Sequence, residues 1–280
     1  MGNVFVWLCY TLLLTASGES APVPLAANEH SWGRFLPNSW CIVQTATISN
    51  IEGRAVQSTQ TVRTILKSVD ESGVTLQETE TIELGGRIVE KKPQSTKYDF
   101  FYEPIQDNVQ ISHGPPDKMM IDKKVVPCAV RIYEQQASSG LLTTTIWYTP
   151  HVYPYVLRVE KIWRSTPEGE NVKGQIVRQS VMLVQETSAL KALRGVRRNR
   201  TYSFRTEEKA GNITRITDAR CSWDMPGGLL ESTTRELDAQ GKEIRRSVSR
   251  MTNFFVHEMF PVPPNQPAWG VPVLPAGTAK

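Results

Sequence analysis

The strongest constraint on the fold is a two-residue alternation of apolar and polar side chains that recurs along the chain. It is clearest at Trp40, Ile42, Ala46 and Ile48, then at Val126, Cys128, Val130 and Ile132, and again at Tyr155, Leu157, Val159 and Trp163. Successive side chains of a β-strand point to opposite faces of a sheet. Each set therefore predicts a strand that buries one face.

Turn sequences rich in glycine separate these apolar segments. They lie at Asp70–Gly73, Gly85–Gly86, Ser138–Gly140, Pro167–Gly169, Lys209–Asn212 and Asp238–Gly241. Glycine and asparagine adopt the positive φ that tight hairpins need. About a dozen short-linked strands predict an antiparallel arrangement. Strands and helices do not alternate, which argues against a doubly wound sheet and most nucleotide-binding folds.

We expect an all-β, mainly antiparallel domain over residues 30–260, built either as one large curved sheet or half-barrel or as two packed meanders. The hydrophobic content of 40% suits a globular core and argues against disorder. A weak self-similarity at an offset of 72 residues relates segments near 121–165 and 193–237, so that Val130 matches Tyr202. It predicts an internal repeat, or else reflects a recurring hairpin pattern.

The first 18 residues have the pattern of an export signal. Val4–Leu14 is an uncharged apolar run of 11 residues, followed by Ala16, Ser17 and Gly18. This length fits a signal peptide and falls short of the roughly 18 to 20 residues that span a bilayer. We predict a signal peptide over residues 1–18 and export to the periplasm or the extracellular space, with a buried N-terminal strand as the alternative. No later segment has spanning length, so we expect no transmembrane segment in the mature protein.

The C-terminal residues and the cysteines indicate no further folded unit. Residues 261–280 hold six of the 18 prolines, which cannot donate to a sheet, so we expect an extended tail there. Beyond the signal, Cys41, Cys128 and Cys221 have no metal-ligand spacing. They are typical of buried apolar positions, although one disulfide remains open.

No catalytic motif stands out. His257-Glu258 begins like a zinc-protease helix, but Pro261 occupies the position of the second histidine. The chain has no G-x-S-x-G elbow, P-loop or dinucleotide fingerprint. A hydrolase built from two distant carboxylates remains open, because such pairs leave no local motif. We expect no metal and no cofactor, and we lean against an enzyme.

Two groups of side chains are candidate binding residues. Aromatic side chains beside prolines can line a ligand mouth, or can plug the open end of a barrel. That group is Trp147, Tyr148, Tyr153 and Tyr155. The second group is basic and would bind an anion, or would be a solvated turn: Arg194, Arg197, Arg198 and Arg200. With a net charge of +4 and predicted export, we expect no nucleic-acid partner.

Several of these segments together resemble uncharacterised secreted bacterial β proteins. The segments are Trp32-x-Arg34-Phe35 with Ser39-Trp40, Thr61–Leu66 before Val69–Val74, and the bends at Trp147–Pro154 and Pro226–Gly228. In architecture alone, the order of long strands is also similar to the lipoprotein-carrier half-barrels. Their curved sheet encloses an apolar cavity for lipid, plugged by helices, whereas here only Thr187–Leu193 has a helical pattern. The resemblance implies a lipid or other amphipathic ligand and no catalytic residue.

These observations lead to three functional hypotheses. The first is an exported, non-enzymatic binding or carrier module for an apolar or amphipathic ligand. The second is a structural or protein-interaction module of the cell envelope, with an envelope protein as partner, and the hydrolase comes third. An enclosed apolar cavity would favour the first hypothesis. A core filled by side chains, with exposed aromatic patches, would favour the second.

Overall fold

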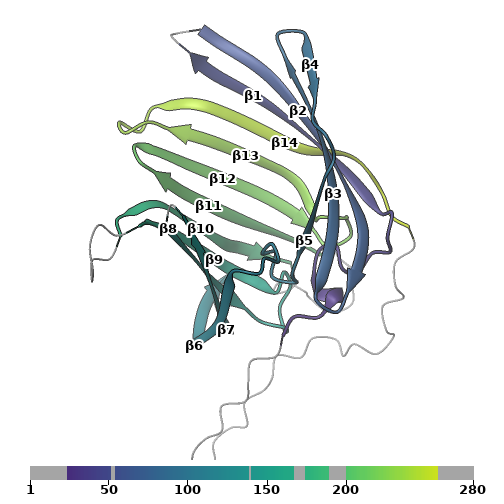
Figure 1. The fold of residues 1–280 in the computed structure, drawn as a ribbon, viewed down its shortest axis with the longest axis vertical. Coiled ribbons are helices and arrows are strands. Elements are labelled where there is room, and N and C mark those ends of the chain that lie inside the picture. The colour runs from purple at the N-terminus through teal and green to yellow at the C-terminus, as the bar shows by residue number, and fades with distance from the viewer. Residues whose placement is uncertain (1–23, 52–53, 139, 167–173, 189–199, 258–280) are drawn as a thin grey trace, which may run out of the picture.

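The computed structural model describes residues 24–51, 54–138, 140–166, 174–188 and 200–257. Within them, fourteen strands form one open, curled antiparallel sheet, and one short 3-10 helix, η1 (Ala27–Glu29), precedes it (Figure 1). The strands are β1 (Trp40–Ile51), β2 (Arg54–Asp70), β3 (Gly73–Leu84), β4 (Arg87–Glu90), β5 (Gln94–Tyr98), β6 (Val109–Ile121), β7 (Lys124–Ala137), β8 (Gly140–Tyr148), β9 (Val156–Ser165), β10 (Ile176–Thr187), β11 (Thr201–Ala210), β12 (Ile213–Ser222), β13 (Leu229–Leu237) and β14 (Glu243–Phe255). The predicted signal peptide and the proline-rich tail lie outside the described residues.

Most strands pair with their neighbours in sequence. The order across the sheet is β4-β3-β2-β1-β14-β13-β12-β11-β10-β9-β8-β7-β6, and β5 also pairs with β3. The pairing of β1 with β14 therefore joins the two ends of the strand series inside the sheet. Of the two predicted architectures, the single curved sheet is the one observed, and it is consistent with a half-barrel.

The sheet curls around residues 24–39, which we call the cap. Trp32 and Phe35 of the cap pack against β1–β3, whereas Leu25 packs against β7–β9. Along the sheet β1 and β9 lie six strand spacings apart, or roughly 29 Å. Phe100, in the loop after β5, nevertheless contacts both clusters. Only the concave side of a curled sheet brings such distant strands to one side chain, so we call the face that contacts the cap the inner face (Figure 1).

Local hydrogen bonds fix the conformation of the cap. The Glu29 carboxylate accepts a 2.7 Å hydrogen bond from the Ala26 amide, and Nδ1 of His30 accepts one of 3.1 Å from the Trp32 amide. Gly33 lies so close to the Ala27 carbonyl oxygen that a Cβ would sit 2.3 Å from it. This position therefore excludes any side chain.

The predicted strand faces are right in one place and wrong in another. Val126, Cys128 and Val130 of β7 are buried on one face, as expected. In β1 the apolar set from Trp40 to Ile48 lies instead on the outer face, and Ile48 is 55% exposed. The opposite residues of β1, from Cys41 to Thr47, face inward. The prediction for β1 was wrong because many inner-face side chains of this sheet are Ser or Thr. The buried face of β1 is therefore not its more apolar face.

The turn predictions agree with the structure wherever it describes them; of the predicted turn residues, 139 and 167–169 lie outside the described part. Gly85, Gly211 and Gly241 adopt the expected positive φ. The offset of 72 residues relates β7, β8 and β9 to β11, β12 and β13 in order. However, it equates Val130 on the outer face with Tyr202 on the inner face. A duplication therefore stays a prediction, and residues 193–199 of the second segment lie outside the described part.

Candidate functional site

The inner face carries different kinds of side chain at different positions along the strands. At the end covered by the cap, many of these side chains are aromatic. Tyr148, Tyr153 and Tyr155 are all buried there. Tyr148 meets Phe101 edge to face at 4.7 Å, and Tyr153 meets Trp223 in the same way, also at 4.7 Å. Burial raises the pKa of all three phenols, that of Tyr155 to about 12, so they are neutral at physiological pH. These predicted site residues pack against the cap, and binding of a ligand by them stays a prediction.

Trp147, the fourth predicted aromatic residue, lies on the other face of β8. Its indole Nε1 donates a 2.9 Å hydrogen bond to Asp117, and the Arg158 guanidinium lies 4.4 Å from its ring. Its register partners Val130 and Arg158 share that outer face. Successive strand residues alternate, so Trp147 and Tyr148 point to opposite faces of β8. A ligand mouth lined by both of them stays a prediction.

A buried arginine lies between the cap and the sheet. The Arg34 guanidinium carbon is 4.5 Å from the Phe35 ring and 4.3 Å from the Trp223 ring. Burial lowers the pKa of Arg34 to about 10, so it keeps its charge at neutral pH, and Asp224 partly offsets the effect. Among the described residues, its Nε and Nη2 have no hydrogen-bond partner. Aromatic faces therefore stabilise this charge where hydrogen bonds do not.

Of the predicted anion-binding arginines, only Arg200 is among the described residues. Its carbonyl oxygen accepts a 2.7 Å hydrogen bond from the Trp223 amide, and its guanidinium lies 5.8 Å from the Trp223 ring. Arg194, Arg197 and Arg198 lie outside the described residues. Anion binding by this group stays a prediction.

Two rows of hydroxyl side chains cross the middle of the inner face. We call them the hydroxyl rows. One contains Thr45, Ser249 and Ser232, and the other contains Thr47, Ser247, Thr234, Thr217 and Thr206. Hydrogen bonds of 2.9 Å join Thr45 to Ser249, Thr47 to Ser247, and Thr217 to Thr234. The central inner face is therefore polar, and these three bonds pair six of the eight hydroxyl side chains in the rows.

An ion-pair ladder lies on the inner face next to the hydroxyl rows, on the side away from the cap. Its order is Arg178–Glu208–Arg215–Glu236–Arg245, from β10 to β14. Arg215 holds Glu236 through Nε at 2.9 Å and Nη2 at 2.7 Å. The two glutamate side chains are 15% and 13% exposed, whereas those of the three arginines are 58%, 42% and 46% exposed. Solvent in the curl therefore meets mainly guanidinium groups.

A depression of about 180 Å³ lies at the end of β13 and β14 nearest the cap. Met225, Leu230, Met251, Thr252, Asn253 and Phe254 line it. Met251 and Leu230 each lie two residues from a serine of the hydroxyl rows, Ser249 and Ser232. The depression is therefore next to the polar centre of the inner face, and its methionines adapt to ligands of different shape.

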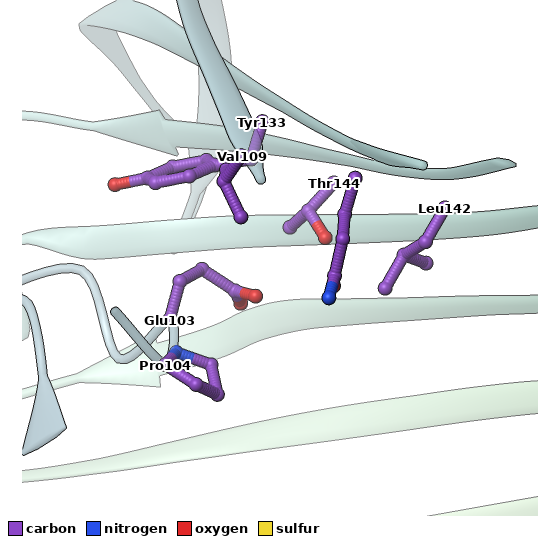
Figure 2. Close-up of a pocket in the computed structure, with 7 residues that line it drawn as sticks. Glu103, Pro104, Val109, Tyr133, Leu142 and Thr144 are labelled. Carbon is purple, nitrogen blue, oxygen red and sulfur yellow. The ribbon is translucent and has the colours of Figure 1, made fainter. Parts of the chain in front are cut away.

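A second, smaller cleft holds a carboxyl group with a shifted pKa. Figure 2 shows Glu103 reaching from its loop toward Thr144, with Val109 and Tyr133 beside it. Burial raises the pKa of Glu103, although Lys161, at 2.8 Å, opposes the shift.

The neighbouring carboxylate, Asp99, is used for structure. It accepts hydrogen bonds from the amides of Phe101 and Glu103 and from the Tyr133 hydroxyl. The cleft volume of about 20 Å³ suffices for one water molecule and leaves no room for a sugar ring. This pair of carboxylates therefore gives the hydrolase hypothesis no substrate site.

In the described part of the chain, no three His, Cys, Asp or Glu side chains come together as a metal site would require. Nor does that part contain a helix of the length and apolarity needed to cross a membrane. Cys41, Cys128 and Cys221 are free and buried, which agrees with the prediction that they are apolar core residues.

Comparisons with known proteins give two weak structural likenesses. No family model and no curated protein matches the chain. One solved structure, a candidate outer membrane lipoprotein-sorting domain from Vibrio parahaemolyticus, has 8% identity and a TM-score of 0.34 over 79% of this chain and 85% of its own. Another, a candidate exported protein with a YmcC-like fold from Bacteroides fragilis, has 7% identity and a TM-score of 0.30 over 79% and 98%.

The two likenesses match the weak resemblance expected from the sequence, to secreted β proteins and to lipoprotein carriers. Both TM-scores are well below 0.5. We therefore build the functional proposal on the residues of this chain alone.

Proposed function

We propose that the protein is a non-enzymatic binding module that holds one amphipathic ligand along its inner face. The observation that carries the proposal is the order of surfaces along β13 and β14. A depression lined in part by Leu230 and Met251 is followed by the hydroxyl rows, and these by the ion-pair ladder. An amphiphile with an apolar chain, a polar linker and a charged head has the same order of groups. The predicted signal peptide would place this binding in the periplasm or outside the cell.

The open curl supports a ligand of this kind better than a wholly apolar one. The cap fills the apolar end of the inner face, where Phe35 and Leu66 have no exposed surface. Beyond it, charged and hydroxyl side chains line the curl, and an apolar ligand would strip water from them without returning hydrogen bonds. A ligand with polar groups of its own avoids that cost.

A second function, an interaction module of the cell envelope, is favoured by one edge of the sheet. The hairpin of β3 and β4 exposes Leu84, Ile88 and Val89, and Ile88 is 70% exposed. β4 is also an edge strand with unpaired backbone groups. Such an edge is suited to pairing with a strand of another protein.

Binding of the neutral fluorescent probe N-phenyl-1-naphthylamine tests the first function. We expect the probe to brighten on binding the wild-type protein and Met251→Gln to weaken its binding about tenfold, because a buried amide without partners costs roughly 1 to 3 kcal/mol. The matched control is Met120→Gln, since Met120 is 70% exposed on β6, at the opposite edge of the sheet from β4. It should leave binding unchanged. Absence of probe uptake by the folded wild-type protein, or equal weakening by both variants, would contradict the proposal.

A further inference from the structure

Arg245, at the β14 end of the ion-pair ladder, has the longest ion-pair distance of the three ladder arginines. Its Nη1 lies 3.7 Å from Glu236, beyond hydrogen-bond distance, and its side chain is 46% exposed. Glu236 already accepts two short hydrogen bonds from Arg215. The carboxylate is thus neutralised without Arg245, whose guanidinium donors stay available to a ligand.

The ladder as a whole also carries an excess of positive charge. It contains three arginines, Arg178, Arg215 and Arg245, and two glutamates, Glu208 and Glu236, so its net charge is +1. The carboxylates lie beneath the guanidinium groups, as their lower exposure shows. An anion that enters the curl therefore meets donors first. Guanidinium groups bind phosphate and carboxylate through paired hydrogen bonds.

Arg245 is on the same strand and the same face as Met251, one of the residues that line the depression. It precedes Met251 by six residues on β14, a separation of roughly 20 Å in a strand. Ser247 and Ser249 lie between them on the inner face. A single extended molecule on this strand would contact thioether, hydroxyl and guanidinium groups in turn.

From this arrangement we infer that the ligand is a long-chain amphiphile with an anionic head group, and that Arg245 binds this head group. The inference rests on the proposed function and adds the class of ligand and one residue that selects it. The hydroxyl rows would face the polar linker of such a molecule, for example a glycerol. The shared head-group chemistry is that of a phosphate monoester or a carboxylate.

Two lipids that differ only in the phosphate provide the test. 1-Palmitoyl lysophosphatidic acid and 1-palmitoylglycerol are titrated, below their aggregation limits, against bound N-phenyl-1-naphthylamine. For the wild-type protein we expect the phosphate lipid to displace the probe at about tenfold lower concentration, as hydrogen bonds to a charged group allow. Inorganic phosphate alone should not displace the probe, because it has no chain to enter the depression.

The matched variants are Arg245→Gln and Arg246→Gln, neighbours on β14 that point to opposite faces. Both remove one positive charge, so they change the net charge of the protein equally. We expect Arg245→Gln to reduce the preference for the phosphate lipid to less than about twofold and to leave displacement by 1-palmitoylglycerol unchanged. Arg246→Gln should keep the full preference.

The outcomes separate this inference from the proposed function. Equal displacement by the two lipids, or equal loss of preference in both variants, would overturn the role of Arg245 while amphiphile binding stood. Displacement of the probe by inorganic phosphate would also overturn the inference, since it would indicate a site for the free anion. If wild-type protein bound neither probe nor lipid, the proposed function itself would fall.

Discussion

Replacing Phe35 with alanine is expected to lower the free energy of unfolding by about 3 to 5 kcal/mol, the usual cost of removing a large buried aromatic side chain. Phe35 has no exposed surface and packs with Trp32, Cys41 and Leu66. Its ring also lies 4.5 Å from the Arg34 guanidinium carbon. The substitution would therefore leave a cavity between the cap and β1–β3 and would remove one of the aromatic faces around a buried charge.

Urea unfolding followed by circular dichroism measures this loss. Phe255→Ala is the control, because Phe255 is 48% exposed and has only long ring contacts, with Trp40 at 6.3 Å and with His257 at 6.4 Å among the described residues. It should cost less than about 1 kcal/mol. Similar small losses in the two variants would mean that the cap does not hold the curl of the sheet.

Stability is also expected to fall by about 2 to 3 kcal/mol between pH 7 and pH 4.5 because of His30 alone. Burial lowers the pKa of His30 in the folded protein to about 3, whereas an unfolded histidine titrates near 6.5. Between these values the unfolded chain binds the proton and the folded chain does not. The contribution is complete above about pH 6.5 and declines as the pH falls toward 3.

His30→Asn isolates this effect. An asparagine carbonyl can replace Nδ1 as the acceptor for the Trp32 amide, but it does not titrate. Glu29 and Glu103, whose pKa values are raised in the folded protein, act in the opposite direction. Since both proteins contain them, the difference between wild type and variant reports His30. Parallel pH profiles for the two proteins would contradict a buried neutral His30.

The fold was largely predictable from local patterns. Glycine turns such as Gly85–Gly86 and Gly211–Asn212 mark hairpins because few other residues adopt positive φ. Hairpins in turn pair strands that are neighbours in sequence, so an antiparallel sheet follows. The pairing of β1 with β14 was not predictable, because no turn links these strands and their contacts are long-range.

The candidate site was much less accessible from the sequence. The aromatic residues beside prolines correctly indicated a cluster, since the structure brings Tyr148, Tyr153 and Tyr155 together under the cap. The hydroxyl rows and the ion-pair ladder leave no local motif in the sequence, because their members are separate polar residues spread over β1 and β10–β14. The sequence of β14 does contain this order: every second residue, Arg245, Ser247, Ser249 and Met251, runs from charged through hydroxyl to apolar. Only strand register shows that neighbouring strands repeat that order.

The most direct test of a single amphiphile on the inner face is native mass spectrometry with 1-palmitoyl lysophosphatidic acid. The wild-type protein is expected to give a one-to-one adduct that Met251→Gln largely loses and Met120→Gln keeps. Protein purified from its own host should carry an amphiphile of the same class. Recovery of bare protein alone, both from the host and after challenge with the lipid, would contradict the account.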